Sequence, residues 1–146
     1  MYNLKRCNGT FKGNIGECLF KLTKRNLFLT RFHSKYKVLN IISKFLTREQ
    51  KDFLNSNWYS IDGIELVNDV LTIYEIKTRN RYKTPLKYKP KTTSYTISLY
   101  SKAIKIGFIV KTVFVWLEED WNFSLEIKDF NSRSFCEDKA KIYDKL

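Results

Sequence analysis

Asp62, Glu75 and Lys77 are the residues of this chain whose types and spacing could do chemistry. All three lie in SIDGIELVNDVLTIYEIKTRN, residues 60–80. Two carboxylates held close together in a partly dry site repel each other unless a cation lies between them. Mg²⁺ binds proteins through one or two carboxylates and keeps several of its waters. The pattern therefore predicts a Mg²⁺ site on Asp62 and Glu75, with Lys77 orienting a water or offsetting charge.

A β-hairpin is the element that would bring the two carboxylates together. Asn68 and Asp69 both tolerate the positive φ of a two-residue turn, and alternating strands flank them. Pairing outward from that turn places Asp62 opposite Glu75, with Cβ atoms about 4.5–5.5 Å apart, and puts Lys77 on the same face. That face also carries the aliphatic residues Ile64, Leu66, Leu71 and Ile73.

The same three residues could instead form a solvated cross-strand charge cluster. Lysine is abundant, and a second Glu-x-Lys occurs by chance at Glu126-Ile127-Lys128. The nearest upstream acids belong to the connecting turn 118–121, so they lack the cross-strand position of Asp62. Spacing alone leaves both interpretations open.

The composition indicates a basic globular protein, which we expect to form one domain over residues 1–146. Hydrophobic residues make up 43% and aromatic residues 16% of the chain. Lysine and arginine exceed aspartate and glutamate by 27 to 15, which gives a net charge of +12. This charge favours a polyanionic partner, with nucleic acid first and an acidic membrane surface second. A merely lysine-rich chain is the competing explanation.

Cysteine usage and hydropathy indicate the compartment. Cys7, Cys18 and Cys136 are odd in number and widely spaced, so neither a disulfide framework nor a zinc site is indicated. The chain begins without an apolar signal core, and Lys111 interrupts its best apolar run. We expect an intracellular protein of the cytoplasm or nucleoid, with no membrane association and no organic cofactor.

Periodicity predicts a mixed α/β order of elements. Residues 13–26 favour a helix, and 27–39 a strand that runs into a basic loop. Residues 41–55 look helical, with a capping box at Thr47 and Gln50. After the hairpin we expect a cationic loop at 78–91, a helix at 92–107, strands at 108–117 and 122–130, and a charged tail.

The loop at 78–91 contains both prolines and no acid, and it directly follows Lys77. Cations bind phosphate without reading sequence, and tyrosines can stack on an unpaired base. A solvated loop is the plain alternative. The candidate nucleic-acid-binding residues are Arg79, Arg81, Tyr82, Lys83, Lys87, Lys89 and Lys91, together with Lys35 and Lys37 of the earlier basic segment; Tyr88 is interleaved among them.

The stretch from Asp62 to Glu75-Ile76-Lys77, on a hairpin that is followed by a helix and a strand, resembles the PD-(D/E)XK nuclease superfamily. Small size and basic charge make it most similar to the archaeal Holliday-junction resolvases. The resemblance implies a restriction-endonuclease-like core, and metal ligation by Asp62, Glu75 and the carbonyl of Ile76. It also implies that Lys77 assists the attacking water and that Glu17, in GNIGECLF, completes the site.

Two departures and three ambiguous residues accompany the resemblance. Ile61 stands where the motif's name has proline, and 35–56 holds more helix than a minimal resolvase has there. Glu17 could instead pair with Lys21 one helical turn later. His33 and Ser34 match a mobile basic loop that carries a serine in resolvases, although a solvated loop explains them as well.

The resemblance implies a Mg²⁺-dependent endodeoxyribonuclease, with Mn²⁺ as a substitute, that cuts by in-line attack of water. Branched DNA is the implied substrate and a homodimer the implied assembly, with a role in recombination or repair. Trp116, Trp121 and Phe123 are interface candidates and equally good core residues. The alternatives are a non-catalytic DNA- or RNA-binding module and an RNA-directed nuclease of the same fold.

Overall fold

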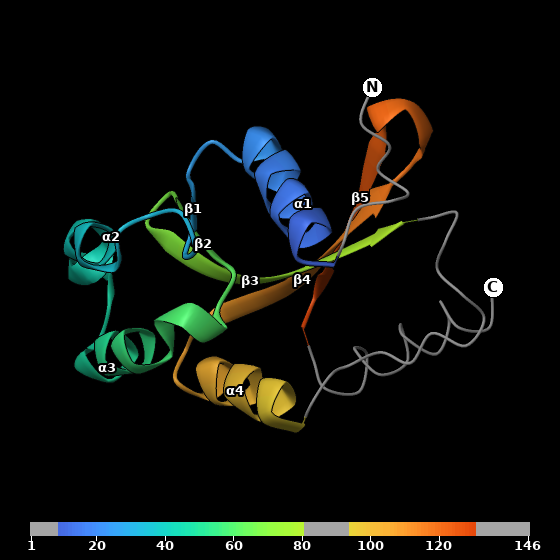
Figure 1. Cartoon of the computed structure of the whole chain (residues 1–146). Coiled ribbons are helices and arrows are strands. Elements are labelled where there is room, and N and C mark those ends of the chain that lie inside the picture. Colours follow the sequence, from blue (N-terminus) through green and yellow to red (C-terminus); the bar gives the residue numbers. More distant parts are fainter. Residues whose placement is uncertain (1–8, 81–93, 131–146) are drawn as a thin grey trace.

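A five-stranded mixed β-sheet forms the centre of the molecule (Figure 1). The computed structural model describes residues 9–80 and 94–130. Neighbouring strands are antiparallel except β3 and β4, which run parallel. The strands lie side by side in chain order: β1 Leu27–Leu29, β2 Gly63–Val67, β3 Val70–Asn80, β4 Ile109–Leu117 and β5 Phe123–Asp129.

Helices flank both faces of this sheet, so the predicted mixed α/β class is confirmed. Figure 1 shows α1, Gly9–Thr23, on one side of the sheet and α4, Ser94–Lys105, on the other. α2, Lys35–Ile42, and α3, Arg48–Asn57, share the side of α4. The short 3₁₀ turns are η2 Ser43–Phe45, η3 Trp58–Ser60 and η4 Glu119–Trp121.

The alternation of the strands divides the core into two apolar layers. The layer under α1 is built from Phe20, Leu27, Leu29, Tyr74, Ile76, Val113, Val115 and Leu117. The larger layer, under α2, α3 and α4, includes Val38, Ile42, Phe53, Leu54, Trp58, Ile61, Ile64, Ile73, Leu99, Tyr100, Phe108 and Val110. Residues of β3 contribute alternately to the two layers, which places this strand in the middle of the fold.

The β2–β3 hairpin has the predicted turn and register. Asn68 and Asp69 adopt φ angles of 49° and 66°, the left-handed conformation that a two-residue turn requires. Val67 pairs with Val70, and pairing continues in step to Gly63 and Tyr74. The register that places Asp62 next to Glu75 at the end of the hairpin is therefore confirmed.

The segment after α1 differs from its prediction. The strand β1 is only three residues long, and a second helix follows where a basic loop was expected. Ser34 is the N-cap of α2, since its hydroxyl accepts a hydrogen bond from the backbone amide of Lys37. Lys35 and Lys37 therefore lie in the first turn of a helix. Because residues 27–33 alternate like a strand, the sequence did not predict a helix start at Ser34.

The other helices follow their sequence signals. Thr47 and Gln50 form the predicted capping box and start α3. The helix at 92–107 is present as α4, and Gly107, with φ of 101°, follows its end. The first helix lies a few residues earlier than predicted, at Gly9–Thr23 instead of 13–26.

The predicted loop at 78–91 begins too early, because β3 continues to Asn80. Thr78, Arg79 and Asn80 pair with Val115, Trp116 and Leu117 of β4. The remainder of that loop, 81–91, and the charged tail lie outside the described residues. The final hairpin is present as β4 and β5, joined by η4. Within residues 9–80 and 94–130, no helix is long and apolar enough to cross a membrane.

Candidate active site

Asp62 immediately precedes β2. The last paired residues are Gly63 and Tyr74, so β3 runs on past the start of β2. Where the ladder stops, Oδ2 of Asp62 accepts a hydrogen bond of 2.8 Å from the backbone amide of Ile76. The N–H and C=O of one strand residue point toward the same neighbour. The Ile76 carbonyl therefore faces the same edge as Asp62.

Thr30, the residue that follows β1, fixes the backbone of Asp62. The amide of Thr30 donates to the Asp62 carbonyl at 3.1 Å, and the Thr30 hydroxyl donates to the Ile61 carbonyl. Trp58, buried in the larger core layer, donates from its indole Nε1 to the Thr30 carbonyl at 3.2 Å. These bonds use the backbone groups around Asp62 and leave its side chain to turn toward β3.

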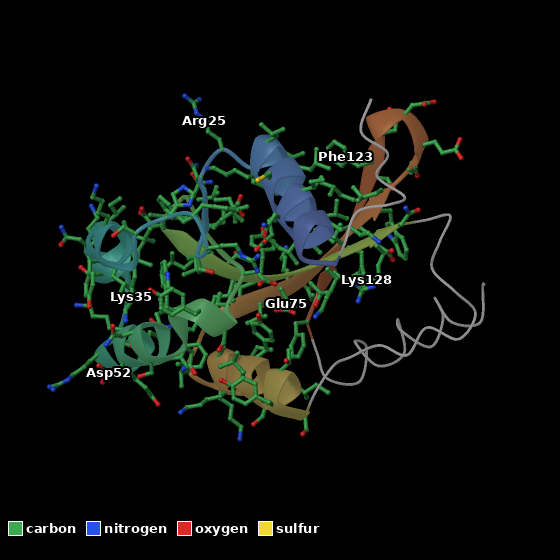
Figure 2. All side chains as sticks on the ribbon, viewed as in Figure 1. Arg25, Lys35, Asp52, Glu75, Phe123 and Lys128 are labelled. Atoms are coloured by element: carbon green, nitrogen blue, oxygen red, sulfur yellow. The ribbon has the colours of Figure 1, made fainter. Side chains whose placement is uncertain are left out.

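Glu75 is buried, and both of its carboxylate oxygens have partners. Oε1 forms an ion pair of 2.9 Å with Nζ of Lys77, which lies two residues along the same face of β3. Oε2 accepts a hydrogen bond from the hydroxyl of Tyr100, a fully buried residue of α4. Figure 2 shows Glu75 near the middle of the fold, between α1 and α4. Strand and helix thus hold this carboxylate in one position.

The charges around Asp62 favour a cation. Burial raises the pKa of Asp62 well above its ordinary value, and the nearby negative charges of Glu75 and Glu17 raise it further. The hydrogen bond from Ile76 and the charge of Lys77 act in the opposite direction. Burial also raises the pKa of Tyr100, and the charges of Glu75 and Asp62 add to this effect. A positive charge at this position would relieve the repulsion between the carboxylates.

Glu17 reaches this region from α1 because the helix packs very closely on β3. A Cβ added to Gly16 would lie 1.8 Å from the Thr78 hydroxyl oxygen, so only glycine allows this approach. Glu17 is buried, and its Oε2 lies 3.7 Å from Nε of Arg31. Burial raises the pKa of Glu17; Arg31 opposes that shift and Glu75 adds to it. Its sequence-based alternative partner, Lys21, donates to the carbonyl of Arg25 at 3.2 Å.

The donors at this position suit a hard divalent cation that keeps its waters. Asp62, Glu75 and the Ile76 carbonyl all offer oxygen, the ligand atom that Mg²⁺ prefers. In the described part of the chain, no three His, Cys, Asp or Glu residues gather closely enough to hold a metal among themselves. Mg²⁺ needs only one or two carboxylates, so this donor set fits it and does not fit a closed zinc site.

A buried hydroxyl next to Glu75 agrees with that fit. Thr112 of β4 is the register partner of Glu75 and is 3% exposed. Among the described residues, its hydroxyl oxygen has no hydrogen-bond partner. Unpaired buried hydroxyls are costly and are expected where an ordered water or ion supplies the missing bond. A hydrated ion beside Glu75 would provide that water.

The second Glu-x-Lys motif is an internal control. Glu126 and Lys128 of β5 form an ion pair of 2.9 Å, the same distance as between Glu75 and Lys77. Their side chains are 42% and 36% exposed, against 8% and 22% for Glu75 and Lys77. The ion pair alone therefore does not distinguish the candidate site. Burial and the neighbouring Asp62 do.

The proposed cationic surface is described only in part. Arg81, Tyr82, Lys83, Lys87, Lys89 and Lys91 lie outside the described residues, as does Tyr88. Arg79 lies in β3, where its guanidinium donates to the Thr78 carbonyl at 2.8 Å. Lys35 and Lys37 lie on α2. Figure 2 shows Lys35 and this helix well away from Glu75. The structure thus does not bring these two lysines to the carboxylates.

His33 and Ser34 have structural partners. Nδ1 of His33 lies 3.0 Å from both the amide nitrogen and the carbonyl oxygen of Leu29, and its ring packs edge-on against Phe28. Ser34 caps α2. These contacts support the non-catalytic interpretation of both residues.

The described aromatic residues of the last hairpin are core residues and not an exposed interface. Trp116 is buried, stacks on Phe114, and donates to Glu126 at 3.3 Å. Phe123 is partly buried against the α1-side core. Both agree with the core interpretation, and Trp116 is too buried to serve as an exposed interface residue. The side chain of Trp121 lies outside the described residues.

Sequence reasoning missed Tyr100 and Arg31. Tyr100 lies on the apolar stripe of α4, one residue after Leu99, where a tyrosine reads as ordinary core. A buried tyrosine hydroxyl needs a partner, which is the one signal that could have found it. Arg31 lies in the segment predicted as a strand that runs into a basic loop, and no sequence signal related it to α1. Its guanidinium contacts Glu17 and Asn14 of α1.

No protein-family model matches the chain, and no curated protein matches it with significant sequence similarity. What the site does therefore follows from its own geometry and charge.

Proposed function

We propose that this chain is a Mg²⁺-dependent endonuclease of the PD-(D/E)XK type that hydrolyses DNA phosphodiesters. The observation that carries the proposal is the charge interaction of Asp62, just before β2, with Glu75, together with the 2.9 Å ion pair of Lys77 and Glu75. Two carboxylates, a backbone carbonyl and a lysine on one partly buried edge are the groups that metal-assisted phosphate hydrolysis requires.

The arrangement of elements supports the same proposal. A helix that carries Glu17 precedes the motif hairpin, and a helix and a parallel strand follow it. This is the order that the resemblance to a restriction-endonuclease-like core implies. The additional helices α2 and α3 lie between β1 and β2, where the sequence already indicated more helix than a minimal resolvase has.

In the proposed reaction, Asp62, Glu75 and the Ile76 carbonyl would hold the ion. A bound Mg²⁺ would supply polarisation of the phosphate and a lower pKa for the attacking water. Lys77 orients that water for in-line attack and offsets the negative charge that develops on the phosphate. Tyr100 keeps Glu75 in place through its hydroxyl. The negative charge of Glu17 adds to that of Asp62 and Glu75. No covalent enzyme intermediate forms.

The substrate, assembly and location belong to the same proposal. The net charge of +12 favours binding of a polyanion such as DNA. Branched DNA, a homodimer and an intracellular location rest on the resemblance and on composition. An RNA substrate would use the same residues, so only substrate comparison separates the two.

A non-catalytic nucleic-acid-binding module is the second candidate, and one observation favours it. Glu126 and Lys128 make an equally short ion pair on the edge strand, at a position without an opposing carboxylate on β4. Glu75 and Lys77 could likewise be only structural. In that case the chain would bind nucleic acid with a strong salt dependence and would cut none.

The test is cleavage of an end-labelled four-way junction and a matched linear duplex with Mg²⁺, Mn²⁺ or EDTA. Metal-dependent cutting by the wild type, lost in Lys77→Ala and kept in the matched control Lys128→Ala, would support the nuclease. Salt-sensitive binding without cutting in any metal would leave the binding module. The preferred DNA would define the substrate, and an oligouridine arm would reveal activity on RNA.

A further inference from the structure

Two exposed tyrosines lie on the two elements that meet next to Glu75, η3 and α4. Tyr59 of η3 is 85% exposed, and Tyr95 of α4 is 60% exposed. Aromatic rings of this size are usually at least partly covered. Tyr100 of α4 contacts Glu75, and η3 contacts Tyr100 through the carbonyl of Ser60.

Ser60 connects these tyrosines to the carboxylates. Its hydroxyl lies 3.4 Å from the hydroxyl of Tyr95, and its carbonyl lies 3.5 Å from the hydroxyl of Tyr100. Tyr100 in turn donates to Glu75. Ser60 also follows Tyr59 and precedes Asp62 by two residues. This path places Tyr95, and the backbone turn that carries Tyr59, next to the residues that hold Glu75.

The backbone that carries Tyr59 is held firmly although its ring is exposed. The preceding residue, Trp58, is 1% exposed, and its indole is bonded to Thr30. The amide of Ile61 donates to the Trp58 carbonyl at 3.2 Å and closes the 3₁₀ turn. A ring presented on a fixed backbone loses little conformational freedom when it binds a partner.

We propose that Tyr59 and Tyr95 form a stacking rim for unpaired bases of the DNA strand that enters the carboxylate site. This inference rests on the proposed function and names its substrate class: DNA with single-stranded character. Bases stack on aromatic side chains with little regard to sequence, but only when their faces are not covered by neighbouring bases in a duplex. The positive charge of the chain attracts the backbone, and the tyrosines select strands whose bases are free.

The binding test uses the full chain in EDTA, so that cleavage does not interfere. Fluorescence anisotropy would compare a labelled short oligothymidine with a blunt hairpin duplex. We expect Tyr59→Ala and Tyr95→Ala each to weaken binding of oligothymidine about tenfold and to leave duplex binding unchanged. Tyr95→Phe and Tyr59→Trp keep a ring and should bind like the wild type.

Tyr36→Ala is the matched control. Tyr36 is 77% exposed on α2, an element that lies apart from α4 in Figure 1. Its substitution should not change binding of oligothymidine. Equal affinity of the wild type and both rim variants would overturn the inference, and so would an equal loss in Tyr36→Ala or a parallel loss of duplex binding.

A second measurement uses the wild type and avoids any effect of substitution on folding. An oligothymidine that carries 5-iodouracil would be photocrosslinked to the chain, and the modified peptides would be identified by mass spectrometry. Cross-links at Tyr59 or Tyr95 support the rim, and cross-links confined to other residues contradict it. Tighter binding of oligouridine than of oligothymidine would overturn the assignment to DNA.

The two proposals can fail separately. Tyrosine-dependent binding without metal-dependent cutting would reject the nuclease and keep the rim. Cutting that is unaffected by either tyrosine, with unchanged binding, would reject the rim and keep the nuclease.

Discussion

The hydroxyl of Tyr100 donates a hydrogen bond to Oε2 of Glu75, so that α4 directly holds a carboxylate of β3. Both residues are buried, and Lys77 binds the other oxygen of the same carboxylate. Glu75 is therefore held both from its own strand, by Lys77, and from α4, by Tyr100. A carboxylate held in this way is preorganised to bind an ion.

Tyr100→Phe tests this relationship with a minimal change. The variant keeps the ring in the core and removes only the hydroxyl, which leaves one oxygen of buried Glu75 short of a donor. We expect a loss of about 1–3 kcal/mol in the free energy of unfolding, measured by urea denaturation. Tyr95→Phe removes an exposed hydroxyl and should change stability by less than about 0.5 kcal/mol. Equal stability of Tyr100→Phe and the wild type would contradict the role given to this bond.

Gly16→Ala tests the close packing of α1 on β3. The added methyl group would overlap the Thr78 side chain, whereas a Cβ at Gly13 meets nothing within 4 Å. Gly16→Ala should therefore destabilise the fold by about 1–3 kcal/mol or more. Gly13→Ala should be neutral or stabilising by up to about 1 kcal/mol, because alanine favours the helix. Thermal unfolding of the two variants checks this, and equal melting temperatures would refute the close approach.

Glu17→Gln tests the electrostatics of the buried carboxyl group. The pKa of Glu17 is raised in the fold, so the folded state binds its proton more tightly than the unfolded state does. Its contribution to stability is fully present below the unfolded pKa and is lost as the pH rises through the folded pKa. Glutamine does not ionise, so the variant does not lose stability in this way as the pH rises.

The variant should therefore gain stability relative to the wild type as the pH rises above 4.5, the ordinary pKa of glutamate. Urea denaturation without metal at several pH values measures this difference. Glu49→Gln, at an exposed site in the first turn of α3, is the control. A difference between Glu17→Gln and the wild type that is independent of pH would show that Glu17 titrates normally.

Added Mg²⁺ should stabilise the folded chain. An ion that binds only the folded state adds about 1.4 kcal/mol when its concentration is ten times its Kd. Asp62→Asn should abolish this rise in melting temperature, and Glu126→Gln should keep it, since Glu126 lacks an opposing carboxylate. An identical rise in both variants would assign the ion to another site.

Local signals predicted much of the fold, but one local pattern was misleading. The Asn68-Asp69 turn fixed the hairpin register, because every later pair follows from it. The capping box at Thr47 similarly predicted the start of α3. In contrast, residues 27–33 alternate like a strand, so the cap at Ser34 and the helix after it were missed.

The site shows a second limit, because some of its contacts join segments that are distant in the sequence. Register alone places Asp62 beside Glu75, since both lie on one hairpin. The contacts of Tyr100 with Glu75 and of Arg31 with Glu17 join elements that no local pattern relates. The extension of β3 through Thr78 was also missed, because it depends on pairing with β4 and not on the composition of the basic stretch.

The most direct test of the central claim is the rate of DNA cleavage with Mg²⁺ by the wild type and by Asp62→Asn, with binding measured for both. The account predicts cutting by the wild type, its loss by at least about a hundredfold in Asp62→Asn, and retained binding. Glu126→Gln should cut at the rate of the wild type. Cutting that survives in Asp62→Asn, or binding without cutting by the wild type in any divalent metal, would contradict it.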